Sequence, residues 1–373
     1  MLARLRTFFD WLDSPAPLRR LSRPLGIGML ALTAALMAYA AISAGGISGP
    51  SVAVSEQAQT DAGPPDNGDL ALYARIVERV ASGDNYHFAA VAEHRARNYP
   101  VQPFVTVRLP TLAWAFAALG EGGVRWIAIA LLVAAVLVWE RRLTGFGISL
   151  LERAGFAILL YFGAAGIFAE RGLLLHELPA GLLLTLAMGL YGTRFWLLGI
   201  IAALAAVAIR EIAVPFLLVW LVLALVERRW REVVAVLVAF AVFAAIMLAH
   251  AAAVATEVQP GDPASGGWAA ALGLDFVFTS LASFTWLLLL PTALGAALAV
   301  LAATGWLVLG GRLTLFAALW LGGFLLAVAV FARADNLYWV QLTMPAYLAG
   351  LALAPRAIRD LLASAKAPEL KQS

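Results

Sequence analysis

Apolar residues follow one another along this chain in long runs, with little of the alternation that marks half-buried strands. Repeated runs of about 17 to 25 residues are long enough for helices that cross about 30 Å of hydrocarbon. The pattern predicts an all-α, polytopic membrane helical bundle with about ten transmembrane helices. The expected spans are 25–43, 122–139, 154–169, 178–193, 195–209, 213–226, 233–254, 285–309, 313–331 and 337–354.

Composition supports this class and excludes several others. Hydrophobic residues make up 62% of the chain and charged residues 13%, too little charge to cover a soluble protein of 373 residues. The net charge is only +3, and the basic residues lie mostly between the apolar runs, which argues against a nucleic-acid surface. The absence of cysteine excludes disulfides and thiolate catalysis.

The basic residues also predict the topology. Arginines cluster before the first run, which we expect to be an uncleaved anchor and not a cleavable signal peptide. The positive-inside rule then places both termini in the cytoplasm of a cell whose inner (plasma) membrane the chain spans. The expected organisation is a cytoplasmic basic N-terminus (1–24), a transmembrane domain (25–355) and a cytoplasmic tail (356–373). The N-terminal arginines are Arg4, Arg6, Arg19, Arg20 and Arg23.

One further apolar stretch, residues 104–120, is not included among the ten expected spans. It contains Arg108 and Pro110 and follows a proline-rich break. An additional span here would move Arg141, Arg142 and the basic tail to the outer side, against the positive-inside rule. We therefore expect 104–120 to be an interfacial or re-entrant helix.

Most of the polar chemistry falls in the first outer loop, residues 46–121. The segment DLALYARIVERVAS (69–82) places Leu70, Tyr73, Ile76, Val77 and Val80 at helical spacing, which predicts an amphipathic helix lying on the membrane face. A second helix is expected over 86–98. The following YPVQPF enforces an extended path, because proline restricts both itself and the residue before it.

Asp69 opens the first of these helices and has two readings. Aspartate is a favoured helix N-cap, since its side chain accepts hydrogen bonds from free backbone N–H groups. It can also act as a general base near the bilayer surface, with its ionised form favoured by the helix dipole. The two readings are compatible.

The order of residues in this loop resembles the first outer loop of GT-C glycosyltransferases. The similarity is to the polyprenyl-phosphate-sugar-dependent kind, including mannosyl- and aminoarabinosyltransferases. Stretches 176–192, 209–231 and 335–355 also resemble later spans of that superfamily. The loop residues that carry the resemblance are Asp69, Tyr73, Ser82, Gly83, Asp84, Tyr86, Tyr99, Pro100, Pro103, Leu119 and Gly120.

The resemblance implies a membrane glycosyltransferase that moves a sugar from a polyprenyl-phosphate donor to an acceptor hydroxyl on the periplasmic or outer face. An aspartate just after the first span is the catalytic base in that superfamily, which maps onto Asp69. Two departures leave the acceptor (glycan, lipid or protein) and any metal requirement open. Gly68 and Leu70 flank Asp69 where many relatives carry a second acid, and the large soluble C-terminal domain of several relatives is absent.

Further outer-face residues are candidates for binding substrate or lipid phosphate. Two interpretations of Arg210–Glu211 are possible. The two residues form an ion pair that closes a helical hairpin, or Arg210 binds a lipid phosphate. His176 reads either as a structural histidine or as a ligand, and Tyr338 and Trp339 either as interfacial anchors or as rings that bind a sugar. The loop 256–274 is expected to be flexible and to cover the site. The full candidate set, beside Asp69, is Tyr73, Asp84, Tyr86, His94, Tyr99, Arg108, Arg171, His176, Glu177, Arg210, Glu211, Arg333, Asp335, Asn336, Tyr338 and Trp339.

No metal ligands are assigned. Asp61, Asp66, Glu93 and His94 could be combined into a site for a divalent cation such as Mg²⁺ or Mn²⁺, but the two aspartates lie in a loop rich in glycine and proline. The alternative to an enzyme is a non-enzymatic membrane protein, such as a lipid or polysaccharide exporter or an envelope-assembly scaffold. Few ionisable residues fall near mid-membrane, which argues against transport.

Overall fold

The computed structural model describes residues 16–46 and 68–366. Arg4, Arg6, Asp61 and Asp66 therefore lie outside the described residues, and so do residues 47–67 of the expected first outer loop. Within these ranges the chain is all-α, with fifteen α-helices and short 3₁₀ segments. The helices up to the middle of the chain are α2 (Arg23–Gly46), α4 (Asp69–Ala81), α5 (Tyr86–Ala96), α6 (Thr111–Gly145), α7 (Leu150–Gly163), α8 (Glu177–Leu190), α9 (Trp196–Ile209) and α10 (Val214–Val226).

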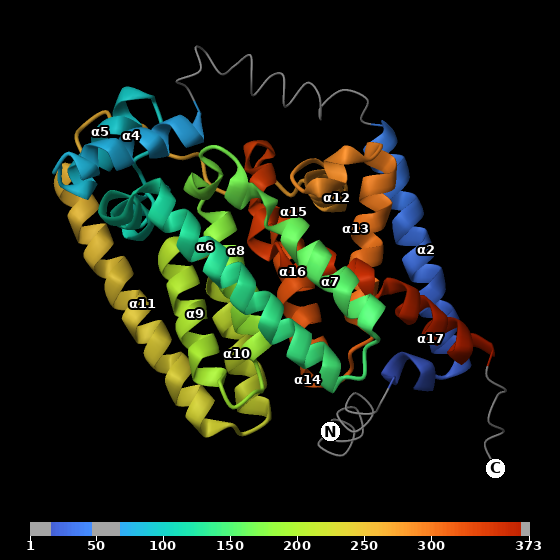
Figure 1. Cartoon of the computed structure of the whole chain (residues 1–373). Helices are drawn as coiled ribbons and strands as arrows, with labels where there is room; N and C mark the ends of the chain where they lie inside the picture. Colours follow the sequence, from blue (N-terminus) through green and yellow to red (C-terminus); the bar gives the residue numbers. More distant parts are fainter. Residues whose placement is uncertain (1–15, 47–67, 367–373) are drawn as a thin grey trace.

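The second half adds α11 (Trp230–Glu257), α12 (Gly273–Ser283), α13 (Thr292–Trp306), α14 (Gly311–Ala317), α15 (Gly323–Phe331), α16 (Ala346–Ala349) and α17 (Ala354–Lys366). A ten-residue 3₁₀ segment, η8 (Ala334–Thr343), connects α15 to α16. Figure 1 shows α4, α5 and α12 at one end of the bundle and α17 toward the other. We call these the α4 end and the α17 end.

In the part of the chain that the structure describes, four helices or helix pairs are long and apolar enough to cross a membrane: Arg23–Ala44, Phe104–Gly145, Trp230–Glu257 and Gly311–Phe331. They indicate a multi-pass membrane protein. The expectation of about ten spans was wrong. Helices α8 and α9 have 14 residues each and α13 has 15. At 1.5 Å per residue these helices are only about 21–23 Å long, short of the hydrocarbon thickness.

The difference arises where an apolar run contains a helix break. The expected span 154–169 ends as an α-helix at Gly163 and continues as a 3₁₀ turn, and 285–309 begins with a 3₁₀ turn and becomes α-helical only after Pro291. The expected span 337–354 is divided among η8, α16 and a further 3₁₀ turn. Hydropathy alone does not reveal these breaks, because the residues on either side are equally apolar.

The stretch 104–120 is not a separate re-entrant helix in the structure. A 3₁₀ turn covers Phe104–Thr106, and α6 begins at Thr111 and continues to Gly145. Gly120, with φ 67° and ψ 173°, breaks the helical path inside α6. Such a positive φ is accessible to glycine at low cost, so α6 consists of two helical segments joined at this residue.

The two helices of the first loop are confirmed close to their expected bounds, but the buried face of α4 differs slightly. Leu72 and Ile76 are buried in a small core with Tyr86 and Val91 of α5. Leu70, expected on the apolar face, is 37% exposed. The cytoplasmic tail expected over 356–373 is largely a packed helix. Residues 354–366 form α17, which packs against α2 and α13.

Within the largely aliphatic main core, a cluster of aromatic rings joins three of the central helices. Trp139 of α6, Phe156 of α7 and Trp306 of α13 meet with ring centroids 5.2–5.6 Å apart. All three are almost completely buried. The two contacts of Trp306 are edge-to-face, a geometry that adds to the hydrophobic burial.

Candidate functional site

Asp69 is held by a residue far away in sequence and does not cap its own helix. It is the first residue of α4, the N-cap position is Gly68, and no side chain caps the helix. The Asp69 Oδ2 atom instead accepts a hydrogen bond of 3.1 Å from the Tyr338 hydroxyl of η8. Tyr99 lies close to Asp69. The N-cap reading is therefore wrong, and Asp69 lies where α4, η8 and the segment after α5 meet.

Asp69 and its tyrosine partners are accessible to solvent. Asp69, Tyr99 and Tyr338 are each half-buried. Burial raises the pKa of Tyr99, and the neighbouring Asp69 carboxylate raises it further, so the phenol stays protonated and can donate to the carboxylate. An ionised carboxylate has about four lone-pair sites, so one tyrosine donor leaves sites for a further hydroxyl.

A chain of alternating charges lies beside this carboxylate. Arg108, just before α6, donates through Nε to the Tyr73 hydroxyl at 3.3 Å and through a terminal nitrogen to Glu211 Oε1 at 3.2 Å. Arg210 pairs with the same Glu211 oxygen, and its Nε contacts Glu177 Oε1 at 2.5 Å. Five of the candidate residues are thus joined in one network.

The local backbone explains why Arg210 points inward. Helix α9 ends at Ile209, Arg210 has extended backbone angles (φ −140°, ψ 103°), and α10 restarts with a proline in its first turn. The Arg210 side chain is 1% exposed, and its guanidinium lies over the Trp339 ring at 5.8 Å. A guanidinium with two carboxylate partners and no exposure closes the α9–α10 hairpin and cannot touch a lipid phosphate in this arrangement.

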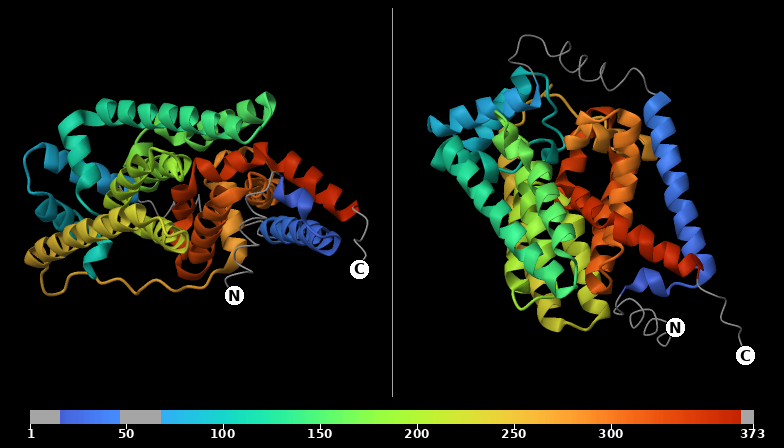
Figure 2. Two further views of the ribbon diagram at one scale, coloured as in Figure 1. Left: turned by 90° about the horizontal axis from the view of Figure 1, so that it is seen from below. Right: turned by 45° about the vertical axis from the view of Figure 1, so that its right-hand side comes forward.

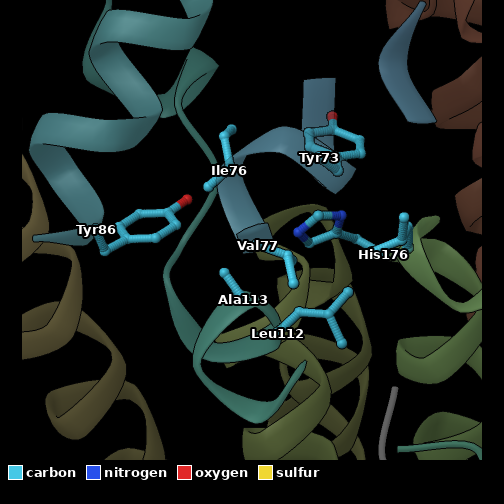
Figure 3. Close-up of a pocket in the computed structure, with 8 residues that line it drawn as sticks. Tyr73, Ile76, Val77, Tyr86, Leu112, Ala113 and His176 are labelled. Atoms are coloured by element: carbon cyan, nitrogen blue, oxygen red, sulfur yellow. The ribbon is translucent and has the colours of Figure 1, made fainter. Parts of the chain in front are cut away.

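A small cavity adjoins the network (Figure 3). It is lined by Tyr73, Ile76, Val77, Tyr86, Leu112, Ala113, Leu174 and His176. Its volume is about 10 Å³, which is space for about one water molecule. The His176 ring packs edge-on against Tyr73 at 4.7 Å, and burial lowers its pKa well below the ordinary value, so His176 is neutral. This cavity does not accommodate a sugar phosphate.

The start of η8 carries an arginine with weaker partners. Arg333 contacts Ser265 Oγ and Asp335 Oδ2, each at 3.4 Å, and its side chain is 34% exposed. Its Nε atom has no hydrogen-bond partner among the described residues. The Asn336 side chain accepts from the Arg333 backbone N–H and fixes the turn. Arg333 is therefore better suited to an external anion than Arg210.

The remaining candidates are not part of the network around Asp69. Asp84 pairs with Arg79 at 2.7 Å on the exposed side of α4. Arg171 is exposed, and its side chain makes no ion pair with any residue that the structure describes. Tyr86 is buried and donates to the Arg108 carbonyl at 2.6 Å, so it positions that arginine's backbone.

His94 is a buried histidine near the Asp69 segment. Its Nδ1 donates to the Pro100 carbonyl at 2.8 Å, and its Nε2 has no partner in the described part of the chain. Burial lowers the pKa of His94 to about 4, partly opposed by the Pro100 hydrogen bond. The residue fixes the turn that presents Tyr99.

The described residues contain no group of three or more His, Asp or Glu side chains arranged to hold a metal ion. Glu93, one of the candidate ligands, already pairs with Arg79 at 3.1 Å and with Arg97. Asp61 and Asp66, two further candidate ligands, lie outside the described residues.

Two features of the site were not found from the sequence. His87 Nε2 lies 3.1 Å from His250 Nδ1, and His250 Nε2 lies 2.9 Å from the Val107 carbonyl, which joins α5 and α11 beside Arg108. Separately, the loop expected to be flexible is fastened: Arg95 contacts Asp262 at 2.5 and 2.9 Å, and Val101 N–H donates to the Pro263 carbonyl. These partners are about 160 residues apart, and no local pattern reveals them.

Comparisons with known proteins give no relative for this chain: no family model, no curated protein and no solved structure matches it.

Proposed function

We propose that the chain is a GT-C-type glycosyltransferase of the cell inner membrane, which transfers a sugar from a polyprenyl-phosphate donor to an acceptor hydroxyl. The α4 end would face the periplasm or exterior, and the α17 end the cytoplasm. The observation that carries the proposal is the half-buried Asp69 carboxylate, held by the hydroxyl of Tyr338 from a distant segment and open to a further donor.

The arrangement suits general-base catalysis. Asp69 takes the proton of the acceptor hydroxyl while the acceptor oxygen bonds to the anomeric carbon of the sugar. The bond from that carbon to the phosphate oxygen breaks, and polyprenyl phosphate leaves with the electron pair. Tyr338 orients the carboxylate, and general-base catalysis of this kind contributes about 10²–10⁴-fold. The donor's isoprenoid tail would remain in the bilayer.

Arg333 is the residue we assign to the departing phosphate. It lies five positions before Tyr338, at the N-cap of the segment η8 that carries Tyr338. A fixed guanidinium that neutralises developing negative charge stabilises the transition state. Arg108 and Arg210 have carboxylate partners already, so their part is to hold the scaffold under the site.

The rival function is lipid or polysaccharide export without chemistry. A direct test uses the purified full chain in proteoliposomes with radiolabelled polyprenyl-phosphate mannose or aminoarabinose as probes and with membrane lipids and envelope glycans as acceptors. A labelled product that contains a new glycosidic bond supports the proposal. Movement of the label across the bilayer with the donor chemically unchanged would support export instead.

A further inference from the structure

A group of exposed cations at the α17 end comes together from two segments that lie more than 300 residues apart in sequence. Three arginines belong to the short helix η1 (Pro17–Arg20) and the start of α2, and two cations belong to α17. All five are exposed, and no ion pair joins any of them to an acid within the described ranges. They are Arg19, Arg20, Arg23, Arg359 and Lys366.

Packing holds these two segments in a fixed relation. Helix α17 contacts both η1 and α2, and Figure 2 shows α17 and η1 together at the foot of α2. A Cβ added at Gly26 would lie 2.1 Å from Ser364 Oγ, so the two helices cross with no space between them. Ser364 itself is completely buried. The cations therefore belong to one built surface.

Helix α17 has one face that is buried against the bundle and one that is exposed. Ala357, Asp360, Leu361 and Ser364 are buried against the bundle. The outer face presents Arg359 and Lys366 on either side of Leu362, which is 44% exposed. Leu25, at the first turn of α2, is 59% exposed. Cations beside exposed leucines at the end of a membrane-spanning helix have the composition of a membrane-interface helix.

We propose that this surface binds the headgroups of anionic phospholipids in the leaflet at the α17 end. The exposed leucines enter the boundary of the acyl chains, while the five cations lie at the level of the lipid phosphates. Arg356, the remaining cation on α17, is already paired with Glu152 and holds the helix to α7. A soluble acidic partner would not require the leucines, so the apolar residues favour a lipid.

The test uses the full chain purified in a neutral detergent and titrated with dioctanoyl phosphatidylglycerol, with dioctanoyl phosphatidylcholine as the zwitterionic reference. Each surface cation contributes about fivefold to affinity for an anionic lipid. The double variant Arg359→Gln/Lys366→Gln should therefore weaken phosphatidylglycerol binding about 25-fold and leave phosphatidylcholine binding unchanged.

The control double variant, Arg75→Gln/Arg171→Gln, removes the same charge from exposed residues at the opposite, α4 end of the bundle, one on α4 and one just before the 3₁₀ turn Gly172–Leu174, which contacts α4. It should change phosphatidylglycerol binding less than twofold. Equal losses in the two double variants, or no loss in either, would overturn the proposal. Displacement of the lipid by millimolar inorganic phosphate would overturn it as well, because the surface would then be a site for the free anion. Melting temperatures without lipid report whether the variants are folded.

Discussion

The Tyr338 hydroxyl and the Asp69 carboxylate are joined by a hydrogen bond of 3.1 Å across 269 residues of sequence. This bond connects the start of α4 to the 3₁₀ segment that precedes the C-terminal helices. It also gives Asp69 a partner outside its own helix, which a capping residue would not need. A carboxylate positioned from both ends of the chain and still half-exposed is the feature on which the proposed transferase depends.

Removing the Tyr338 hydroxyl should slow transfer without abolishing it. A hydrogen bond to a charged group contributes about 1.5–3 kcal/mol, so Tyr338→Phe should reduce kcat by about 10- to 100-fold through loss of carboxylate orientation. Because Tyr338 positions the base and does not bind the donor, KM for the donor should change little. A large rise in KM with unchanged kcat would instead indicate that Tyr338 binds substrate.

The buried ion pair of Arg210 should be required for stability. Removing one partner of a buried pair leaves an uncompensated charge and typically costs about 3–5 kcal/mol. Arg210→Met should therefore lower the unfolding free energy by about that amount, as measured by titration with a denaturing detergent. Arg333→Met, which removes a partly exposed arginine, is the control and should cost less than about 1 kcal/mol. Similar losses in both variants would contradict the assignment of the two arginines.

His94 should make stability depend on pH. Its pKa is about 4 in the folded protein and 6.5 when exposed, so below pH 6.5 the unfolded chain binds a proton that the folded chain does not. Stability contributed by neutral His94 is thus present above pH 6.5 and lost as the pH falls toward 4. Between pH 7 and pH 5 the loss should be about 2 kcal/mol.

His94→Asn preserves a donor for the Pro100 carbonyl but does not titrate in this range. Its unfolding free energy, measured in the same detergent from pH 7.5 to 5, should decline less steeply than that of the wild type. Parallel pH profiles for the two proteins would show that His94 is not neutral when folded.

The ion pair between Arg95 and Asp262 should determine how readily the loop 258–272 opens. Arg95 holds both carboxylate oxygens and the Glu257 carbonyl, so Arg95→Gln should release the loop. Hydrogen–deuterium exchange at residues 258–265 should then increase about tenfold, which corresponds to the loss of one charge-assisted hydrogen bond. Arg75→Gln, on the exposed side of α4, should leave this exchange unchanged. Equal exchange in Arg95→Gln and the wild type would mean that the backbone contacts of Val101 suffice.

The sequence predicted the local elements of the site better than the passage of the chain through the membrane. Spacing located α4 and α5 within two residues, because amphipathic periodicity and flanking glycines are local signals. The number of spans was overestimated, because apolar residues continue through breaks such as Pro291 and the turn after Gly163. Whether an apolar run forms one helix depends on backbone breaks, which hydropathy does not measure.

The role of each candidate residue in the site depends on contacts with residues far away in sequence, which local sequence patterns do not reveal. Arg210 and Glu211 were identified as either a hairpin ion pair or a phosphate site, and only the burial of Arg210 between two carboxylates separates these readings. The pairing of Asp69 with Tyr338 and of His87 with His250 depends on tertiary packing of distant segments. Residue type thus indicated which side chains were candidates, and packing determined their partners.

The central claim is most directly tested by the transfer rate of Asp69→Asn, measured with labelled polyprenyl-phosphate sugar and compared with Glu78→Gln. Glu78 lies on the same helix with its side chain 62% exposed, so its substitution controls for loss of a carboxylate from α4. We expect Asp69→Asn to lose at least about 100-fold in kcat with unchanged donor affinity, and Glu78→Gln to match the wild type. Near-normal transfer by Asp69→Asn would contradict the assignment of Asp69 as the base.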